Sequence, residues 1–256
     1  SLSTAQIAAI ETDDLITLST AQIRGLTTAQ VASLTTDQLV SMGTDQVAAF
    51  TTAQITALTT KQVVALTTDQ ASSLTTAQAA SLTTAQIVAI ETDDLQVMTT
   101  AQLVALTTAQ MPTLTTAQVV ALTSDQVSSL KTAQLASLST AQIAMLETDD
   151  LVTLSTAQIR GLTTAQVASL TTDQLVSMGT DQVAAFTTAQ ITALTTKLVV
   201  ALTTDQASSL TTAQAASLTT AQIVAIETDD LQAMTTAQLV ALTTAQMPAL
   251  TTAQVV

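Results

Sequence analysis

The 256-residue sequence contains no cysteine, no histidine, no tryptophan and no tyrosine. Cysteine and histidine supply most nucleophiles, general bases and soft metal ligands in proteins. We therefore expect neither an enzyme nor a bound cofactor. The absence of cysteine also excludes a disulfide framework, although it constrains the cellular compartment only weakly.

Positive charge is scarce, with five basic residues against nineteen acidic ones and a net charge of −14. Such a chain repels phosphate backbones and anionic lipid surfaces, so nucleic acid is not an expected partner. No stretch reaches the roughly 18 uninterrupted apolar residues of a membrane-spanning helix. Nevertheless 47% of the residues are hydrophobic, which is too many for a disordered linker and predicts an ordered chain.

The order comes from a repeat of eight residues that follows Ser1 without insertion, with octads beginning at Leu2, Ile10, Leu18 and so on to Leu250. No other domain is visible, and we predict one continuous array over residues 1–256, with about 32 octads. A short fixed period is typical of solenoids, in which each unit contacts mainly its neighbours. Because the sequence begins and ends partway through the pattern, we expect it to be a segment of a longer chain.

A longer period of 136 residues, or seventeen octads, lies above the first. Residues 1–120 and 137–256 differ at six positions, among them the pairs Ile16/Val152 and Gln62/Leu198. A large block has therefore been copied almost intact. The duplication lengthens the chain and adds no new type of side chain.

We number the octad positions one to eight from the leading residue, which is usually Leu. Positions 1 and 6 are always apolar, position 3 is Thr except at Ser124, and position 5 is Gln except at four Asp residues and Leu198. Charges occur only at positions 2, 4, 5 and 7. On a helix, position 6 and the next position 1 share one face while positions 4, 7 and 8 face away. The pattern predicts a short helix with the apolar pair inside.

One continuous helix cannot satisfy this repeat, because eight residues advance about 800° and rotate the apolar stripe by roughly 80° per octad. A break therefore falls at the threonine pair of positions 2 and 3. Position 2 with Gln three residues later matches a capping box, whereas position 3 is nearly invariant. We favour position 3 as the N-cap. The predicted fold is an all-α solenoid or superhelical rod with one short capped helix per octad.

The alternative fold is a β-solenoid, since Thr, Val and Ile favour strands. Such coils usually turn at Gly, Asn or Asp-Gly, but this chain has four Gly and no Asn. Positions 1 and 6 also differ in parity and would face opposite sides of a strand. The helical fold is favoured for these reasons.

Two sets of polar residues are candidates for interactions. The position-5 Gln is predicted to bridge neighbouring octads through hydrogen bonds, since an octad alone buries too little to fold. Carboxylates that could bind Ca²⁺ cluster in four octads, although acidic residues are also favoured at exposed helix N-termini. These weak metal candidates are Glu11, Asp13, Asp14, Glu91, Asp93, Asp94, Glu147, Asp149, Asp150, Glu227, Asp229 and Asp230. The threonine rows suggest a further alternative, an ice-binding array, against which stands their use as helix caps.

The units Leu-Thr-Thr-Ala-Gln-Val/Ile-x-Ala resemble octad arrays in very long bacterial exoproteins described as adhesion or haem-utilisation proteins, over the whole chain. The resemblance implies an extracellular or cell-surface location. Haem iron is usually held by His, Tyr or Cys, none of which occurs here. We therefore predict a structural repeat protein of a bacterial filament or adhesin stalk, whose partner is itself, end to end or laterally. A repetitive surface array for Ca²⁺-dependent adhesion or ice binding is the alternative.

Overall fold

The computed structural model describes residues 2–255, which form two compact units divided between Leu130 and Lys131. Each unit is a series of very short helices, three to six residues long, joined by extended corners. No strand occurs in the described range, so the all-α prediction is confirmed and the β-solenoid alternative is not supported. None of the helices between residues 2 and 255 has the length and apolar character needed to cross a bilayer.

The first unit carries fifteen α-helices and one 3₁₀ helix, one for each octad. They are α1 (Thr4–Ala8), α2 (Thr12–Leu15), α3 (Thr20–Arg24), α4 (Thr28–Ser33), α5 (Thr36–Ser41), α6 (Thr44–Ala49), α7 (Thr52–Ala57), α8 (Thr60–Val64), α9 (Thr68–Ser73), α10 (Thr76–Ser81), α11 (Thr84–Ala89), α12 (Thr92–Val97), α13 (Thr100–Ala105), η1 (Met111–Thr113), α14 (Thr116–Val120) and α15 (Ser124–Ser129).

The second unit repeats the pattern. Its helices are α16 (Thr132–Ser137), α17 (Thr140–Met145), α18 (Thr148–Leu151), α19 (Thr156–Gly161), α20 (Thr164–Ala168), α21 (Thr172–Ser177), α22 (Thr180–Ala185), α23 (Thr188–Ala193), α24 (Thr196–Val200), α25 (Thr204–Ser209), α26 (Thr212–Ser217), α27 (Thr220–Ala225), α28 (Thr228–Ala233), α29 (Thr236–Val240) and η2 (Met247–Ala249).

Each α-helix begins at octad position 3, and its N-cap is position 2. In α5, for example, the Thr35 hydroxyl accepts a hydrogen bond from the backbone N–H of Gln38, and the Gln38 side chain accepts one from the backbone N–H of Thr35. This reciprocal pair is a capping box. The prediction that position 3 is the N-cap was therefore wrong, and the capping-box match identified the right residue.

Position 3 lies next to the following turn of the coil. The Thr132 γ-methyl lies 1.8 Å from the place that a Cβ on Gly161 would take, so position 3 of one octad abuts position 8 of the octad three later. Serines at position 8 make the same approach, as where the Ser169 hydroxyl donates to the Thr140 carbonyl at 3.3 Å. Position 8 is small at most octads, with Val97 and Met145 as larger exceptions.

Helices end at the next position 1, whose backbone is extended. Leu34 follows α4 with φ −59° and ψ 139°, and Thr35 continues with φ −73° and ψ 160°. Two extended residues in succession make the corner between consecutive helices. Proline changes one octad in each unit, where a 3₁₀ helix containing Pro112 or Pro248 replaces the α-helix.

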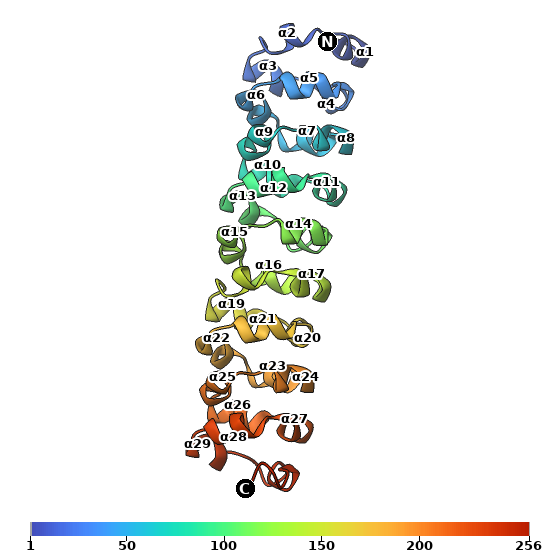
Figure 1. The fold of residues 1–256 in the computed structure, drawn as a ribbon. Helices are drawn as coiled ribbons and strands as arrows, with labels where there is room; N and C mark the ends of the chain where they lie inside the picture. Colours follow the sequence, from blue (N-terminus) through green and yellow to red (C-terminus); the bar gives the residue numbers. More distant parts are fainter. Residues whose placement is uncertain (1, 256) are drawn as a thin grey trace. The chain divides into compact units, whose positions relative to one another are not determined.

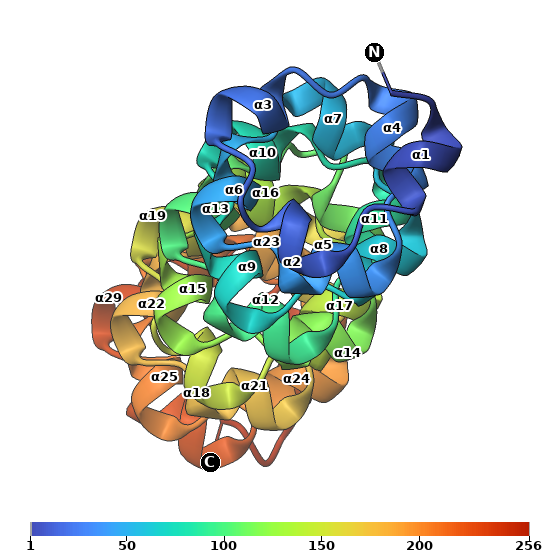
Figure 2. The ribbon, with the colours of Figure 1, turned by 90° about the horizontal axis from the view of Figure 1, so that it is seen from above.

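Three octads complete one turn of the coil in each unit. From the fourth octad of each unit on, a helix packs on the helix of the octad three places earlier, as α4 does on α1, α5 on α2 and α6 on α3. Figure 2 looks along the coil and shows α1, α2 and α3 on its three sides, and Figure 1 shows the turns of the first unit stacked from α1 to α15. Positions that recur every 24 residues therefore lie on the same side of a unit.

The core of each unit is a column of the two predicted apolar positions. Position-6 side chains such as Leu39 and Ile55 are fully buried, and position-1 side chains such as Leu34 and Met42 are nearly so. Ordering eight residues costs on the order of 12 kcal/mol and burying two large side chains returns roughly 3–6 kcal/mol. A turn is therefore stable only when other turns cover it above and below.

Candidate functional site

The glutamines of position 5 are the most repeated polar element, and they connect each corner to the corner one turn below. The Gln38 side-chain amide donates to the carbonyl of Ile7 at 2.9 Å and to that of Ile10 at 2.7 Å. Its oxygen accepts from the backbone N–H of Thr35 in its own corner at 2.8 Å. Gln38 is only 2% exposed. One side chain thus satisfies polar backbone groups in two successive turns.

The same arrangement recurs through both units, with partners 28 and 31 residues earlier. Gln70 donates to Leu39 and Met42, and Gln174 in the second unit donates to Ile143 and Leu146, all at 2.8–2.9 Å. We call each vertical series of these bonds a glutamine ladder, and each unit has three, one along each corner. The prediction that this residue bridges octads is confirmed, but its partners belong to the previous turn rather than to adjacent octads.

Backbone atoms also explain why position 2 tolerates residues that cannot cap a helix. Where the N-cap is Gly43, Gln46 still accepts from its backbone N–H at 3.0 Å, and Gln134 does so from Lys131 at 2.9 Å. The glutamine half of the capping box needs only the main chain. Position 2 can therefore vary while position 5 keeps its residue type.

The four acidic octads differ from the rest at the ladder position. Aspartate is one methylene shorter than glutamine and has no side-chain N–H to donate. Asp94, Asp150 and Asp230 are buried, whereas Asp14 near the start of the chain is exposed. Glu11, Glu91, Glu147 and Glu227 occupy the N-cap without a side-chain capping bond, and the position-4 residues Asp13, Asp93, Asp149 and Asp229 are exposed in the first turn of the helix.

Burial changes the protonation of two of these ladder aspartates. It raises the pKa of Asp94 from 3.8 to about 6, and the nearby charges of Glu91 and Asp93 add to the rise. Burial also raises the pKa of Asp230, which a hydrogen bond to Thr204 partly offsets. The second carboxylate oxygen of Asp230 has no hydrogen-bond partner among the described residues. These carboxyls are held where the ionised form is unfavourable.

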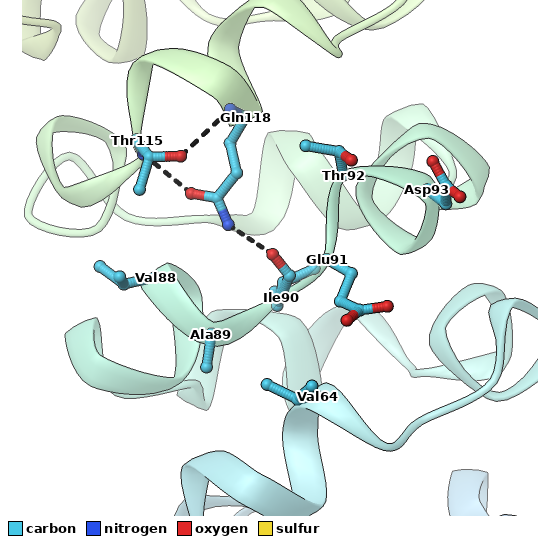
Figure 3. A pocket seen from close by; sticks show the side chains of 9 residues that line it. All are labelled: Val64, Val88, Ala89, Ile90, Glu91, Thr92, Asp93, Thr115 and Gln118. Atoms are coloured by element: carbon cyan, nitrogen blue, oxygen red, sulfur yellow. Dashed lines mark hydrogen bonds between the residues drawn. The ribbon is translucent and has the colours of Figure 1, made fainter.

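An open hollow lies beside the acidic corner at Glu91 (Figure 3), lined also by Val64, Val88, Asp93 and Thr115. Gln118 crosses it and donates to the carbonyl of Ile90 at 2.7 Å. The carboxylates of Glu91 and Asp93 lie on different sides of the Thr92 segment and do not converge (Figure 3).

A matching hollow in the second unit is lined by Glu227, Asp229 and Thr251, among others. Across residues 2–255 no three acidic, histidine or cysteine side chains gather into a group that could hold a metal ion. The sequence candidates are thus brought together in pairs at most, around open corners.

Leu198 is the one place where an apolar side chain occupies the ladder position. It is 2% exposed, and Thr195 still caps α24 by accepting from its backbone N–H at 3.3 Å. The capping box is incomplete there, since leucine cannot accept from the backbone N–H of Thr195.

A surface feature that the octad-by-octad pattern did not indicate is a row of exposed aliphatic residues at position 7. Because 24 residues make one turn, every third octad contributes to one side, and α2, α5, α8, α11 and η1 pack on one another in that order. We call this row the aliphatic column. In the first unit it consists of Ile16, Val40, Val64, Val88 and Pro112, and in the second of Val152, Val176, Val200, Val224 and Pro248. Position 7 compared at every third octad is the sequence signal that would have found it.

Comparison with protein families agrees with the repeat. The family described as the ALTTAQ repeat matches residues 7–44, 35–60, 47–84, 87–124, 143–180 and 223–256. These matches extend over most of the chain and include octads of both units. No curated protein matches the sequence.

Proposed function

Because the chain belongs to the ALTTAQ repeat family, we propose that it is a structural scaffold, part of an extracellular bacterial filament or adhesin stalk that provides reach. The observation that carries this proposal is the glutamine ladder, in which each turn is joined to the previous one by the same bonds. A coil built this way is lengthened by adding octads, with no new contact type required. Such a coil serves to hold other parts of a protein at a distance from the surface that anchors it.

The chemistry of the interior supports a non-catalytic role. The chain has no histidine or cysteine, and its buried glutamines are engaged in corner bonds through both the oxygen and the nitrogen of the side-chain amide. Nothing comparable to a nucleophile beside a base arises from such residues. We assign it a mechanical role for these reasons.

In this proposal the partner is another copy of the chain, end to end or laterally, outside the cell. A net charge of −14 keeps such chains soluble and apart unless specific surfaces meet. Association therefore has to be local and directed, and a candidate surface for it is described in the next subsection.

Calcium-dependent adhesion is a second candidate, favoured by the equivalent hollows beside Glu91 and Asp93 and beside Glu227 and Asp229. Each hollow is lined by two acidic residues, whereas Ca²⁺ takes six to eight oxygen ligands, so binding would be weak. Titration calorimetry with Ca²⁺ measures it directly. Heat of binding that disappears in Glu91→Gln/Glu227→Gln would favour this candidate, and no heat would remove it.

Ice binding is the remaining alternative from the threonine rows. Position-2 hydroxyls such as that of Thr35 accept helix N–H groups, which leaves the exposed position-3 threonines as the array. Thermal hysteresis of the purified chain is the measurement, and its absence would remove this alternative.

The scaffold itself is tested by electron microscopy of the native material and of chains with different octad numbers. Thin filaments of constant width, with a length proportional to the number of octads, are the expected result. Compact globular particles, or lengths that do not follow the octad number, would contradict the proposal.

A further inference from the structure

The aliphatic column places large apolar side chains in water with no function inside its own unit. Ile16 and Val88 are each 49% exposed, and Val40 and Val64 are each 43% exposed. On the other two sides of the first unit, position 7 is mostly small or polar, as at Ala32, Ala48 and Ser72. Four exposed aliphatic side chains therefore follow one another in successive turns on one side of the first unit, and rows of this kind are candidates for interaction sites.

Charged residues beside the column make it asymmetric along its length. Position 4 lies one helical turn before position 7 on the same outer face, so Asp13, Asp37 and Lys61 flank Ile16, Val40 and Val64 in order. The next two turns carry Ala85 and Ala109 at this position. The side chains of Asp37 and Lys61 are exposed. The charge at position 4 thus changes from negative at Asp37 to positive at Lys61 in the next turn.

Lys61 is unusual in a chain of this composition. The basic residues of the first unit are Arg24 and Lys61, and the Arg24 guanidinium is tied to the Ala49 carbonyl at 3.2 Å. Within the described residues Lys61 remains the exposed positive charge on the column side of this unit. The copied unit has the same order, with Asp173 beside Val176 and Lys197 beside Val200.

We propose that the aliphatic column is the docking surface for a second copy of this chain, which lies antiparallel so that Asp37 of each faces Lys61 of the other. A two-fold axis between the turns of Val40 and Val64 pairs Val40 with the second copy's Val64, and Ile16 with its Val88. Such an isologous contact forms both charge pairs at once. This inference rests on the proposed scaffold function and names the surface by which its chains associate laterally.

Charge complementarity selects this arrangement over the parallel one. With two chains parallel, a two-fold axis along the column places the position-4 residues of the two copies on opposite flanks, so neither charge pair forms. Antiparallel chains bring Asp37 of each copy beside Lys61 of the other and keep the 24-residue spacing of the valines matched. Either unit of the second copy fits, because residues 173–200 repeat the pattern of residues 37–64.

One column alone is smaller than the roughly 1,200–2,000 Å² of total buried surface in a stable complex. A chain with two columns, and a filament with many, gains avidity because the second contact forms within an already associated pair. The expected behaviour is therefore weak, reversible association that strengthens with the number of units.

Sedimentation velocity of the 256-residue chain over a wide concentration range is the test. Wild type is expected to associate reversibly, and Val40→Thr/Val64→Thr/Val176→Thr/Val200→Thr to remain monomeric with an unchanged helical spectrum. The matched control is Val97→Thr/Val120→Thr, which alters two equally exposed valines on α12 and α14 and should associate as wild type does. Monomeric wild type, or equal association of both variants, would overturn the proposal.

Charge reversal tests the direction. Lys61→Asp/Lys197→Asp and Asp37→Lys/Asp173→Lys should each weaken self-association by about tenfold at low salt, since two pairs become repulsive. An equimolar mixture of the two variants should recover it, because each then supplies the opposite charge. Failure of the mixture to recover would overturn the antiparallel arrangement.

A lipid membrane is the other possible binding partner of an aliphatic surface, and flotation with neutral and anionic vesicles tests it. Binding to vesicles that is lost in the four-valine variant would show a lipid-facing column and overturn the proposal. Wild-type chains that stay monomeric while native material still forms thin filaments would refute the column and leave the scaffold function standing.

Discussion

Octads 58–65 and 194–201 have the same sequence except at one residue, Gln62 in the first unit and Leu198 in the second. Gln62 donates to the carbonyls of Val31 and Leu34 one turn below and accepts from the backbone N–H of Thr59. Leu198 is buried at the same place and forms none of these bonds. Helices α8 and α24 nevertheless have the same length and span the same positions of their octads.

The comparison separates what forms an octad from what connects it. The threonine cap and the two apolar positions suffice for the helix, since both octads retain them. The glutamine adds the connection to the turn below, at a cost of roughly 1–3 kcal/mol when buried partners lose it. One such loss is absorbed because the core on both sides of α24 is unchanged.

The turn above sharpens the contrast. Both octads receive one bond from above at their leading residue, from Gln86 to the Leu58 carbonyl and from Gln222 to the Leu194 carbonyl, each at 2.8 Å. At the other end of each octad the residue above is Asp94 or Asp230, which lacks a side-chain amide. Octad 58–65 also has its own connection to the turn below, through Gln62, which octad 194–201 lacks. We expect α24 to be the part of the second unit that opens most readily in hydrogen exchange.

The largest effect is expected when the difference at Leu198 is extended to one whole turn. Gln70→Leu/Gln78→Leu/Gln86→Leu removes a connection from each of the three corners at once. At roughly 1–3 kcal/mol per buried residue, the sum rivals the stability of a typical domain. Cooperative loss of protection in hydrogen exchange around residues 39–90 is the expected outcome.

The control for that variant replaces three exposed position-4 alanines, Ala53, Ala77 and Ala85, by serine, which should change little. Equal tolerance of the two sets would show that the glutamines contribute nothing beyond what water provides.

Exchanging the two residues of the natural pair should have an intermediate effect. Gln62→Leu is expected to lower the stability of the first unit by roughly 1–3 kcal/mol, and Leu198→Gln to raise that of the second by a smaller amount, because an apolar contact is lost as bonds form. Denaturant titration with exchange readout at α8 and α24 measures both. No change in either direction would mean that the carbonyls of the corner below are satisfied without the ladder.

A pH-dependent effect of similar or smaller size is expected from the aspartates above these octads. Since the pKa of Asp94 is raised from 3.8 to about 6 in the folded chain, the folded state holds a proton there that the unfolded state has lost. Stability should therefore fall as pH rises from about 4 to about 6, by about 1–3 kcal/mol. In Asp94→Asn/Asp230→Asn this fall should be largely absent from melting curves. A fall of the same size in the variant would assign it to other carboxyls.

The smallest effect concerns the caps. Thr59→Ala and Thr195→Ala each remove a hydroxyl that accepts a helix N–H, at a cost of roughly 0.5–2 kcal/mol. Thr195→Ala should cost at least as much, because α24 has no glutamine to complete the box. Thr60→Ala and Thr196→Ala at position 3 are the matched controls for capping, compared by thermal melting. A larger loss at position 3 would restore that residue as the cap.

Much of the fold could be predicted because it is local. The mismatch between eight residues and the helical repeat requires a break, and the apolar positions 1 and 6 identify the inner face, as Leu39 and Leu34 show. The N-cap was mistaken because invariance was taken as evidence of capping, whereas the hydroxyl that accepts the helix N–H belongs to position 2.

The number of octads per turn could not be predicted. It depends on the angle between consecutive helices, which the sequence of a single octad does not reveal. Three octads per turn decides that Gln38 reaches Ile7 and Ile10 rather than a sequence neighbour. It also decides that Val40 and Val64 share a side and that Asp94 is buried. Once the number three is known, the ladder and the aliphatic column can be derived from the sequence.

The repetition of the corner has a consequence for how such a gene can change. Most octads present the same interior pattern, two apolar positions and one glutamine, so slippage that inserts one such octad after Ala57 would leave these buried contact types available. The surface would change, because Val64 and Val88 would move to the neighbouring side of the coil and would no longer continue the row that contains Val40. Insertions of three octads would preserve it. Selection on repeat number in this chain would then act on the alignment of surface residues into rows along each side. The core would accept any whole number of such octads.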